Sequence, residues 1–284
     1  METLTRYARV IATDKEGNTV ADVDSHIRLS FAFCWANESK AGECAIKIYN
    51  ASDSVQMAIR AKGVYISLIA GTPESYGMVF HGTLVNSYTV QEEMNSVLIV
   101  NVSESPDFFS AYVKLSLNSG ETVGGLLKKA VEGCSAPVAL GRVPERLSKT
   151  VLPRGVSFIG SPITILDDVC RTFNCTYFVS HGILSVYSMD DFTEENPLDI
   201  SFDNGLIHTP AYESYYATFQ CLINSSLRPW RFVRMSDTGN GLFRILSATG
   251  CGDTLEGDWY MSVCGMAQNG LKAALTALTE NIWR

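Results

Sequence analysis

Hydrophobic and polar residues alternate along most of the first hundred positions, a pattern typical of strands that bury one face. One short helix interrupts this pattern: Ser52 or Asp53 can cap it by accepting a bond from an early backbone N–H, and it runs to Ile59. Turn-forming residues occupy positions 14–18. We therefore predict a first β domain over residues 1–108. Its strands are expected at residues 6–12, 26–35, 43–49, 64–70, 78–88 and 97–102.

The apolar period changes from two to about 3.6 in the middle of the chain. Residues 119–133 predict a helix: polar residues at 119–122 precede it, apolar residues follow at helical spacing, and Gly133 can end it. Residues 161–173 predict a second helix with the same pattern and with proline in its first turn. A tight hairpin follows, with His181-Gly182 at its turn. We expect a small α+β domain over residues 109–192, with a surface loop or arm at 133–155.

Strand patterns return in the last third of the chain, after an acidic linker. They predict a second β domain over residues 193–268. Its strands are expected at residues 198–202, 218–223, 232–235, 241–248 and 259–265.

Residues 269–284 have apolar side chains at helical spacing, which predicts an amphipathic C-terminal helix. This helix could cover an edge of its own domain or dock on a neighbouring protein. Aromatic residues near the last strands are further candidates for contact with a partner. The possible partner-interface residues are Leu271, Leu275, Leu278, Trp283, Trp230 and Trp259.

Composition narrows the classes of protein that fit these elements. The 284 residues are 46% hydrophobic and 18% charged, enough for a sizeable core in about two domains. The net charge of -8 argues against a general nucleic-acid binder, which needs a basic surface. Neither a membrane-spanning apolar run nor the apolar core of a signal peptide is present, so we expect no membrane insertion and folding in a cytoplasm.

Candidate chemistry is sparse, and we expect neither an enzyme nor a bound cofactor or metal. The eight cysteines form no Cys-x-x-Cys pair and are expected to be thiols in a chain large enough to fold without disulfides. Two carboxylate pairs, Asp253 with Asp258 and Asp167 with Asp168, could be proposed for glycoside hydrolysis, but turn formation explains the first pair more simply. The four histidines accompany no hydrolase, metalloprotease or phosphate-binding motif.

Several short stretches carry a family resemblance through their order and spacing. They are residues 46–52, 64–71, 79–82, 119–123, 160–167, 205–210, 221–229, 252–254 and 258–259. They resemble the baseplate hub proteins of tailed phages, particularly the Mu-like type with contractile tails, and more distantly the hub half of type VI secretion spikes. The chain departs from that pattern at Trp230, where the family commonly has glycine, and at Ser225-Ser226, which replace a commoner Asn-Pro.

The resemblance implies two tail-tube-like β-barrel domains per subunit, flanking the α+β domain. It implies a homotrimer whose six barrels form a ring that joins the sixfold tail tube to the threefold central spike and lets DNA pass without specific binding. The expected partners are spike and tube proteins, together with tape measure and baseplate wedge proteins, and the expected location is the virion. The alternative is a tail-associated cell-wall-binding module or lysin, because residues 110–190 loosely resemble small glycan-binding domains such as LysM.

Overall fold

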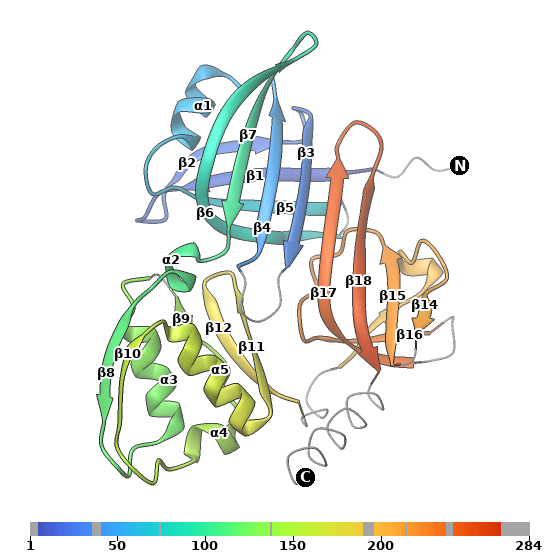
Figure 1. Cartoon of the computed structure of the whole chain (residues 1–284). Helices are drawn as coiled ribbons and strands as arrows, with labels where there is room; N and C mark the ends of the chain where they lie inside the picture. Colours follow the sequence, from blue (N-terminus) through green and yellow to red (C-terminus); the bar gives the residue numbers. More distant parts are fainter. Residues whose placement is uncertain are drawn as a thin grey trace. The chain divides into compact units, whose positions relative to one another are not determined.

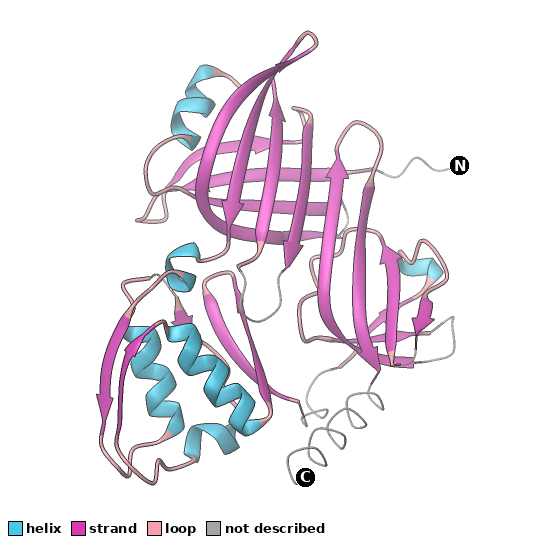
Figure 2. Cartoon of the chain, in the orientation of Figure 1, coloured by secondary structure: helices cyan, strands magenta, loops and turns pink. Residues whose placement is uncertain are grey.

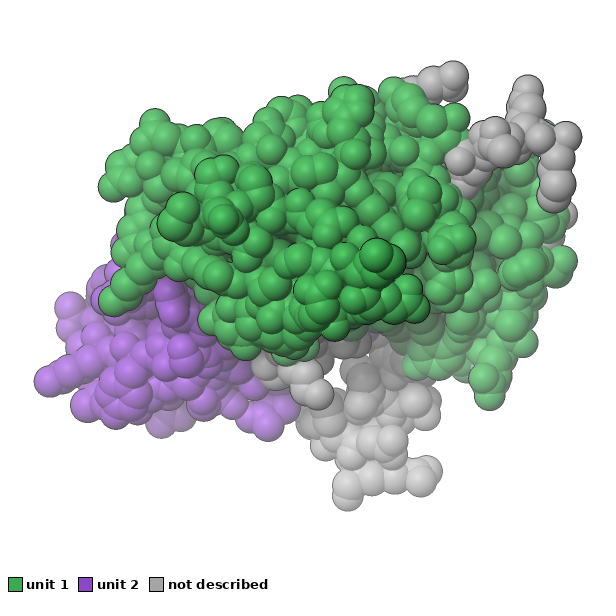
Figure 3. All heavy atoms as spheres, turned by 90° about the horizontal axis from the view of Figure 1, so that it is seen from above, with its two compact units in different colours: residues 1–36, 42–103, 195–284 green, residues 37–41, 104–194 purple. Residues whose placement is uncertain are grey.

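The computed structural model divides the chain into two units, coloured separately in Figure 3. The first unit combines residues 1–36, 42–103 and 195–284, and the second combines residues 37–41 and 104–194. The structure describes residues 5–35, 41–73, 75–136, 138–189, 196–213, 215–236 and 241–267.

The first strand set of the larger unit comprises β1 to β7, which pair antiparallel in the order β3-β4-β7-β6-β5-β1-β2. Helix α1 connects β4 to β5, and Ser52 caps it by accepting the Val55 N–H. Strand β6 is long: residues up to Thr83 pair with β5, and residues from Thr83 onward pair with β7, with a register shift between Leu84 and Asn86. The elements are β1 (Tyr7–Thr13), β2 (Thr19–Asp24), β3 (Leu29–Trp35), β4 (Glu43–Tyr49), α1 (Asp53–Ile59), β5 (Tyr65–Thr72), β6 (Ser75–Glu92) and β7 (Asn95–Ser103).

The second strand set comprises β13 to β18, and β14, β15, β18, β17 and β16 pair antiparallel in that order. Strand β13 adds to β16 in parallel. Strand β17 also shifts register, between Ile245 and Ser247. The elements are β13 (Leu198–Ile200), the 3-10 helix η1 (Phe202–Asn204), β14 (Ala211–Glu213), β15 (Tyr216–Cys221), β16 (Phe232–Met235), β17 (Gly241–Asp253) and β18 (Trp259–Ala267).

The two strand sets are joined into one thirteen-stranded sheet, because β17 pairs antiparallel with β3. Figure 1 shows β6, β7, β4 and β3 beside β17, β18, β15 and β14, so eight strands lie side by side across both sets. One continuous hydrophobic core lies behind them. Phe33 of β3 is central to it, since its ring lies 5.5 Å from that of Trp35 and 6.5 Å from that of Phe80.

The smaller unit holds two small sheets and the four helices α2 to α5, drawn as cyan ribbons in Figure 2. Its own core gathers one face of α3 and of α5 against the strands. Thr122 and Ser161 cap these two helices, which begin within the predicted ranges 119–133 and 161–173. The elements are α2 (Pro106–Phe109), β8 (Val113–Leu117), α3 (Val123–Glu132), β9 (Ala139–Leu140), α4 (Glu145–Lys149), β10 (Val156–Gly160), α5 (Pro162–Phe173), β11 (Cys175–Ser180) and β12 (Ile183–Ser188).

The mainly β fold class with an α+β middle part is confirmed. The hairpin turn is also at its predicted place: His181 and Gly182 have φ values of 53° and 75° between β11 and β12. Residues 133–155 differ from the expected loop, because β9 pairs with β12 and Leu147 of α4 is buried. Strands β2, β8, β9, β10 and β14 were not predicted.

The two β blocks were predicted as separate domains, 1–108 and 193–268, but they share one sheet and one core. Whether each folds alone therefore stays a prediction. The predicted C-terminal helix, residues 269–284, lies outside the described residues.

Candidate functional site

The two strand sets repeat one arrangement, both in chain order and in space. Strands β3, β4, β5, β6 and β7 correspond to β14, β15, β16, β17 and β18: in both sets the first pairs with the second, the second with the fifth, the fifth with the fourth and the fourth with the third, all antiparallel. Both fourth strands also carry a register shift. The eight-stranded region is thus built from two four-stranded copies of one pattern.

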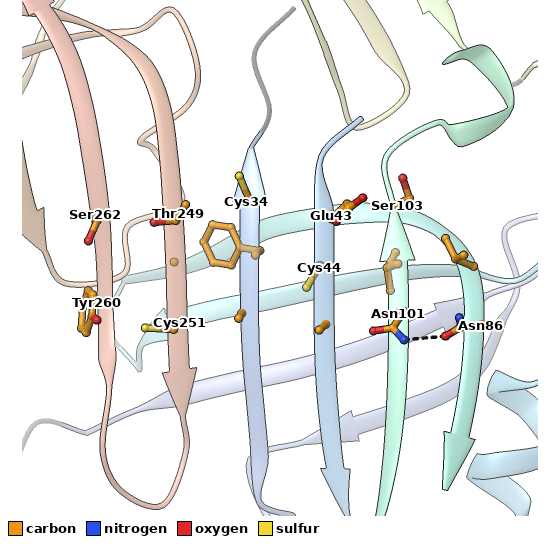
Figure 4. Close-up of a pocket in the computed structure, with 16 residues that line it drawn as sticks. Cys34, Glu43, Cys44, Asn86, Asn101, Ser103, Thr249, Cys251, Tyr260 and Ser262 are labelled. Carbon is orange, nitrogen blue, oxygen red and sulfur yellow. Dashed lines mark hydrogen bonds between the residues drawn. The ribbon is translucent and has the colours of Figure 1, made fainter. Parts of the chain in front are cut away.

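One face of this eight-stranded region is open to solvent. Along β3, Phe31 and Phe33 point into the core, whereas the alternate residues Ala32 and Cys34 are exposed. A groove of about 610 Å³ runs over this face, with lining side chains from β6, β7, β4, β3, β17 and β18 (Figure 4). We name it the sheet face and define it by the exposed residues of these six strands.

Small and polar side chains dominate the sheet face. Asn101 donates to Asn86 at 2.6 Å across β7 and β6. A neighbouring hollow of about 620 Å³ shares Ala32, Ala45 and Cys251 with the groove, which makes the concave surface continuous across the junction of the two strand sets. The sequence contained a signal for this face, since residues 30, 32 and 34 are small and alternate with bulky apolar residues. Periodicity alone could not show that the strands lie side by side.

The charged side chains on the sheet face are mostly acidic. Lys47 of β4 pairs with Glu92 at 2.7 Å, and Arg28 pairs with Asp253 at 3.0 Å, so both basic groups that line these hollows are neutralised. Glu43 and Asp258 add further negative charge. A surface of this kind has few basic side chains that could bind the phosphate groups of a nucleic acid.

Asp253 fixes the hairpin between β17 and β18 against the start of β3. Its carboxylate accepts bonds from the Arg28 guanidinium and from the backbone N–H groups of Leu255 and Glu256. Burial by itself would raise the pKa of Asp253, but the bonds from Arg28 and the two backbone groups outweigh it, so the pKa lies below its ordinary value. The residue is an ionised structural group, which fits the turn interpretation.

The other candidate acids and bases also have structural contacts. Asp167 accepts a bond from the Tyr177 hydroxyl at 2.9 Å, whereas Asp168 forms an ion pair with Arg171. His81 stacks on Tyr65, and burial lowers the pKa of its imidazole. Within the described ranges no group of His, Cys, Asp or Glu is arranged to hold a metal ion, and none of the described helices is long and apolar enough to span a membrane.

The thiols of Cys34 and Cys251 are free, as the sequence predicts, and lie on the sheet face. Partial desolvation of the two thiols raises the pKa of both, so they are protonated at neutral pH.

Trp230 occupies a backbone conformation that favours glycine, with a φ of 69°. The turn therefore keeps the geometry for which the resembling family commonly uses glycine. The indole ring is 3% exposed, and the Arg244 guanidinium lies 4.8 Å from its centre. The indole ring thus makes a cation–π contact with this arginine.

Trp259 is also buried, at 4% exposure, with its ring 5.6 Å from that of Phe31 and the Arg6 guanidinium 5.8 Å away. Both tryptophans belong to the core of the single chain, and a role at a partner interface stays a prediction. The remaining interface candidates, Leu271, Leu275, Leu278 and Trp283, lie outside the described residues.

Comparisons of the sequence find no matching protein-family model and no matching curated protein. Solved structures do match. The prophage MuSo2 43 kDa tail protein from Shewanella oneidensis superposes with a TM-score of 0.64 at 7% identity, over 93% of this chain and 98% of that one. A tail protein from Neisseria meningitidis gives 0.63 at 8% identity, over 94% and 97% of the two chains.

The Escherichia coli c3393 protein matches with a TM-score of 0.61 at 10% identity, over 85% of this chain and 74% of that one. It is described as a component of the type VI secretion system with structural similarity to the bacteriophage T4 tail proteins gp27 and gp5. The resemblance stated from the sequence is therefore confirmed at the level of the fold, and this chain has the fold shared by these phage tail and type VI secretion proteins.

Proposed function

We propose that this chain is a structural subunit of a phage tail, the hub at which the tail tube meets the central spike. The observation that carries the proposal is the eight-stranded region built from two copies of one four-stranded pattern. Each subunit with two such copies presents two similar surfaces. Three subunits would thus offer six similar surfaces to a sixfold tube while keeping threefold symmetry for a spike.

The sheet face would line the lumen of this ring. Most of its lining residues are small or polar, and Glu43 and Asp258 add negative charge to it. Because DNA is polyanionic, such a surface would let it pass without holding it. The mechanism is therefore assembly and guidance rather than catalysis, in keeping with the structural contacts of the candidate carboxylates.

The test is single-particle electron microscopy of the full-length protein, alone and co-expressed with the proteins encoded beside it. Threefold rings with six lobes and a hole wide enough for DNA are expected. Tube and spike proteins should bind opposite ends of such a ring. Particles that stay monomeric under both conditions would overturn the proposal. If the parent protein cleared peptidoglycan and the Asp253→Asn variant did not, the lysin alternative would be favoured instead.

A further inference from the structure

Two hairpins of the eight-stranded region carry its most exposed large apolar side chains. Met94 lies in the turn between β6 and β7 and is 95% exposed, and Leu255 lies in the turn between β17 and β18 and is 67% exposed. We name residues 93–94 and 254–257 the hairpin tips. Single exposed apolar residues are common on protein surfaces, so exposure alone does not indicate a contact.

The two tips occupy corresponding positions in the two strand sets. The register shifts align β17 with β6, because one shift precedes Ser247 and the other precedes Asn86. Counting from these residues, Glu92 corresponds to Asp253, and each tip begins at the next residue. An exposed apolar side chain that recurs at corresponding places of two hairpins points to a shared role.

The same alignment holds across the neighbouring strands. In the first set, the register pairs lead from Asn86 to Asn101, Ala45 and Ala32. In the second set, they lead from Ser247 to Cys264, Thr218 and Ala211. Tyr212 of β14 therefore stands where Phe33 stands in β3, and Thr89 of β6 stands where Gly250 stands in β17.

Both tips lie at the same end of the strands, because neighbouring strands alternate in direction from β6 through β7, β4, β3 and β17 to β18 (Figure 1). The opposite end is not repeated. There the first strand set leads into the smaller unit, since residues 37–41 lie between β3 and β4 and residue 104 follows β7. In the second set, Glu213 and Tyr216 close a short turn between β14 and β15. One end thus carries two similar hairpins per chain, and the other carries one insertion per chain.

Each hairpin is braced at its base by a residue from outside the hairpin. The Ser96 N–H donates to the Asn50 side chain at 3.0 Å, and the Asn50 N–H donates to the Ser96 carbonyl at 2.7 Å. Arg6 donates to the carbonyls of Asp253 and Gly257, both at 2.7 Å. The tips are therefore held in fixed positions, which lowers the entropy cost of binding a partner.

The charged side chains of the two tips are acidic. Glu93 precedes Met94 and is exposed, and Glu256 follows Leu255 with 74% of its side chain exposed. Glu256 lies 3.8 Å from the Arg28 guanidinium, which leaves most of its carboxylate open to solvent. Neither tip contains Lys or Arg. A complementary partner therefore has apolar pockets with basic side chains around them.

We propose that the hairpin tips insert into apolar pockets with basic rims on a ring of six identical subunits, so that this end of the hub faces the tail tube. Two corresponding tips per chain give six tips at one end of a trimer. The opposite end, with one insertion per chain, matches a threefold partner. This inference rests on the proposed function, because it assumes three copies in a ring. It adds the end that binds the tube and the two side chains that anchor it.

Removing the apolar side chains tests this contact in the full-length protein. The probe is the tail tube protein encoded beside this chain, and cosedimentation of hub rings with assembled tubes measures binding. We expect Met94→Ser and Leu255→Ser each to weaken binding at least about tenfold, because truncating a buried interface anchor costs that much. Each change is repeated three times in a ring, so the double variant should lose binding altogether.

Tyr112→Ser is the matched control. Tyr112 is 71% exposed, lies in the smaller unit and belongs to neither tip. This variant should bind tubes as the parent protein does. All three changes remove exposed side chains, so their melting temperatures should stay close to that of the parent, and electron microscopy should show intact rings.

Reversing the charge of the tips tests the basic rim of the pockets. Rings with both Glu93→Lys and Glu256→Lys should lose tube binding, because like charges would then face each other. Rings with both Glu93→Gln and Glu256→Gln should bind with a weaker dependence on salt than the parent. Tube binding at parental strength by the lysine variant would overturn the inference.

The outcomes separate the tips from the ring. Tube binding by Met94→Ser and Leu255→Ser rings that equals parental binding would overturn the inference and leave the proposed function standing. Loss of spike binding in place of tube binding would overturn it as well, since the tips would then lie at the other end of the hub. If the tip variants formed no rings while Tyr112→Ser did, the tips would join copies of this chain, and the inference would again fail. A parent protein that forms no rings would overturn both.

Discussion

The two strand sets differ most at the strand edge where the fourth strand meets the next sheet. In the second set, β17 carries Gly250, and the Phe33 ring lies directly against it: an added Cβ atom would be 2.3 Å from the ring. In the first set, β6 carries Thr89 at the corresponding position, with its hydroxyl group donating to Gln56 at 2.9 Å. Phe33, which lies opposite Gly250, is 3% exposed, whereas Tyr212, at the corresponding position of β14, is 49% exposed.

This difference distinguishes a strand edge that is sealed within the chain from one that is exposed. The β17–β3 junction is sealed by aromatic packing that forms as the chain folds. The edges at β6 and β14 instead carry hydroxyl groups on half-exposed side chains, Tyr88 and Tyr212. The same strand pattern is therefore sealed at one edge and exposed at another.

Exchanging the residues at the two corresponding positions should give the largest effect. Gly250→Thr places a branched side chain against the Phe33 ring, where there is no space, and is expected to lower the free energy of unfolding by about 2–3 kcal/mol. Chemical denaturation monitored by circular dichroism measures this. The reverse exchange, Thr89→Gly, should cost only about 0.5–1 kcal/mol, mainly through backbone entropy. Equal losses at both positions would contradict the distinction between the two edges.

The ion pairs beside the two hairpins provide a second comparison, since Asp253 corresponds to Glu92. Asp253→Asn removes charge-assisted bonds from Arg28 at a site where the carboxylate is 14% exposed. The expected loss is about 2 kcal/mol of unfolding free energy at neutral pH.

This loss should depend on pH with a definite sign. The pKa of Asp253 is lower in the folded protein than its ordinary value of 3.8, so the stabilisation is complete above that value and disappears as pH falls through the folded pKa. The difference between the parent and Asp253→Asn should therefore shrink in acid. A difference that stays constant from neutral pH to well below 3.8 would show that the charge of Asp253 contributes nothing.

Local signals in the sequence predicted much of the fold. The caps at Ser52, Thr122 and Ser161 and the turn at His181-Gly182 depend on bonds between neighbours in the chain, so their positions could be predicted. Strand β14 could not, because three exposed residues carry no periodic pattern. Helix α4 was missed for a related reason: five residues with one buried side chain, Leu147, resemble a loop in sequence.

The sheet face required knowledge that a single sequence does not contain. Its six lining strands come from residues 30–103 and 249–262, and only the pairing of Thr249 with Cys34 and of its neighbours shows that they adjoin. Long-range pairing depends on which strands become neighbours in the sheet, and the local sequence pattern does not determine this. The repeated strand order can be recognised only in the three-dimensional structure, for the same reason. Corresponding residues such as Gly250 and Thr89 differ in side-chain type, so the sequence does not reveal the repeat.

The smallest expected effect concerns the first hairpin. Glu92 pairs with Lys47 at 2.7 Å, but both side chains are about two-fifths exposed, at 39% and 41%. Glu92→Gln should therefore lower the free energy of unfolding by only about 0.2–1 kcal/mol, and added salt should reduce that difference further. Lys47→Gln is the matched control, and the double variant should cost less than the two single changes together. If Glu92→Gln instead destabilised the monomer as much as Asp253→Asn, the two hairpins would be equally integrated into the core, and the contrast between a sealed and an open edge would not hold.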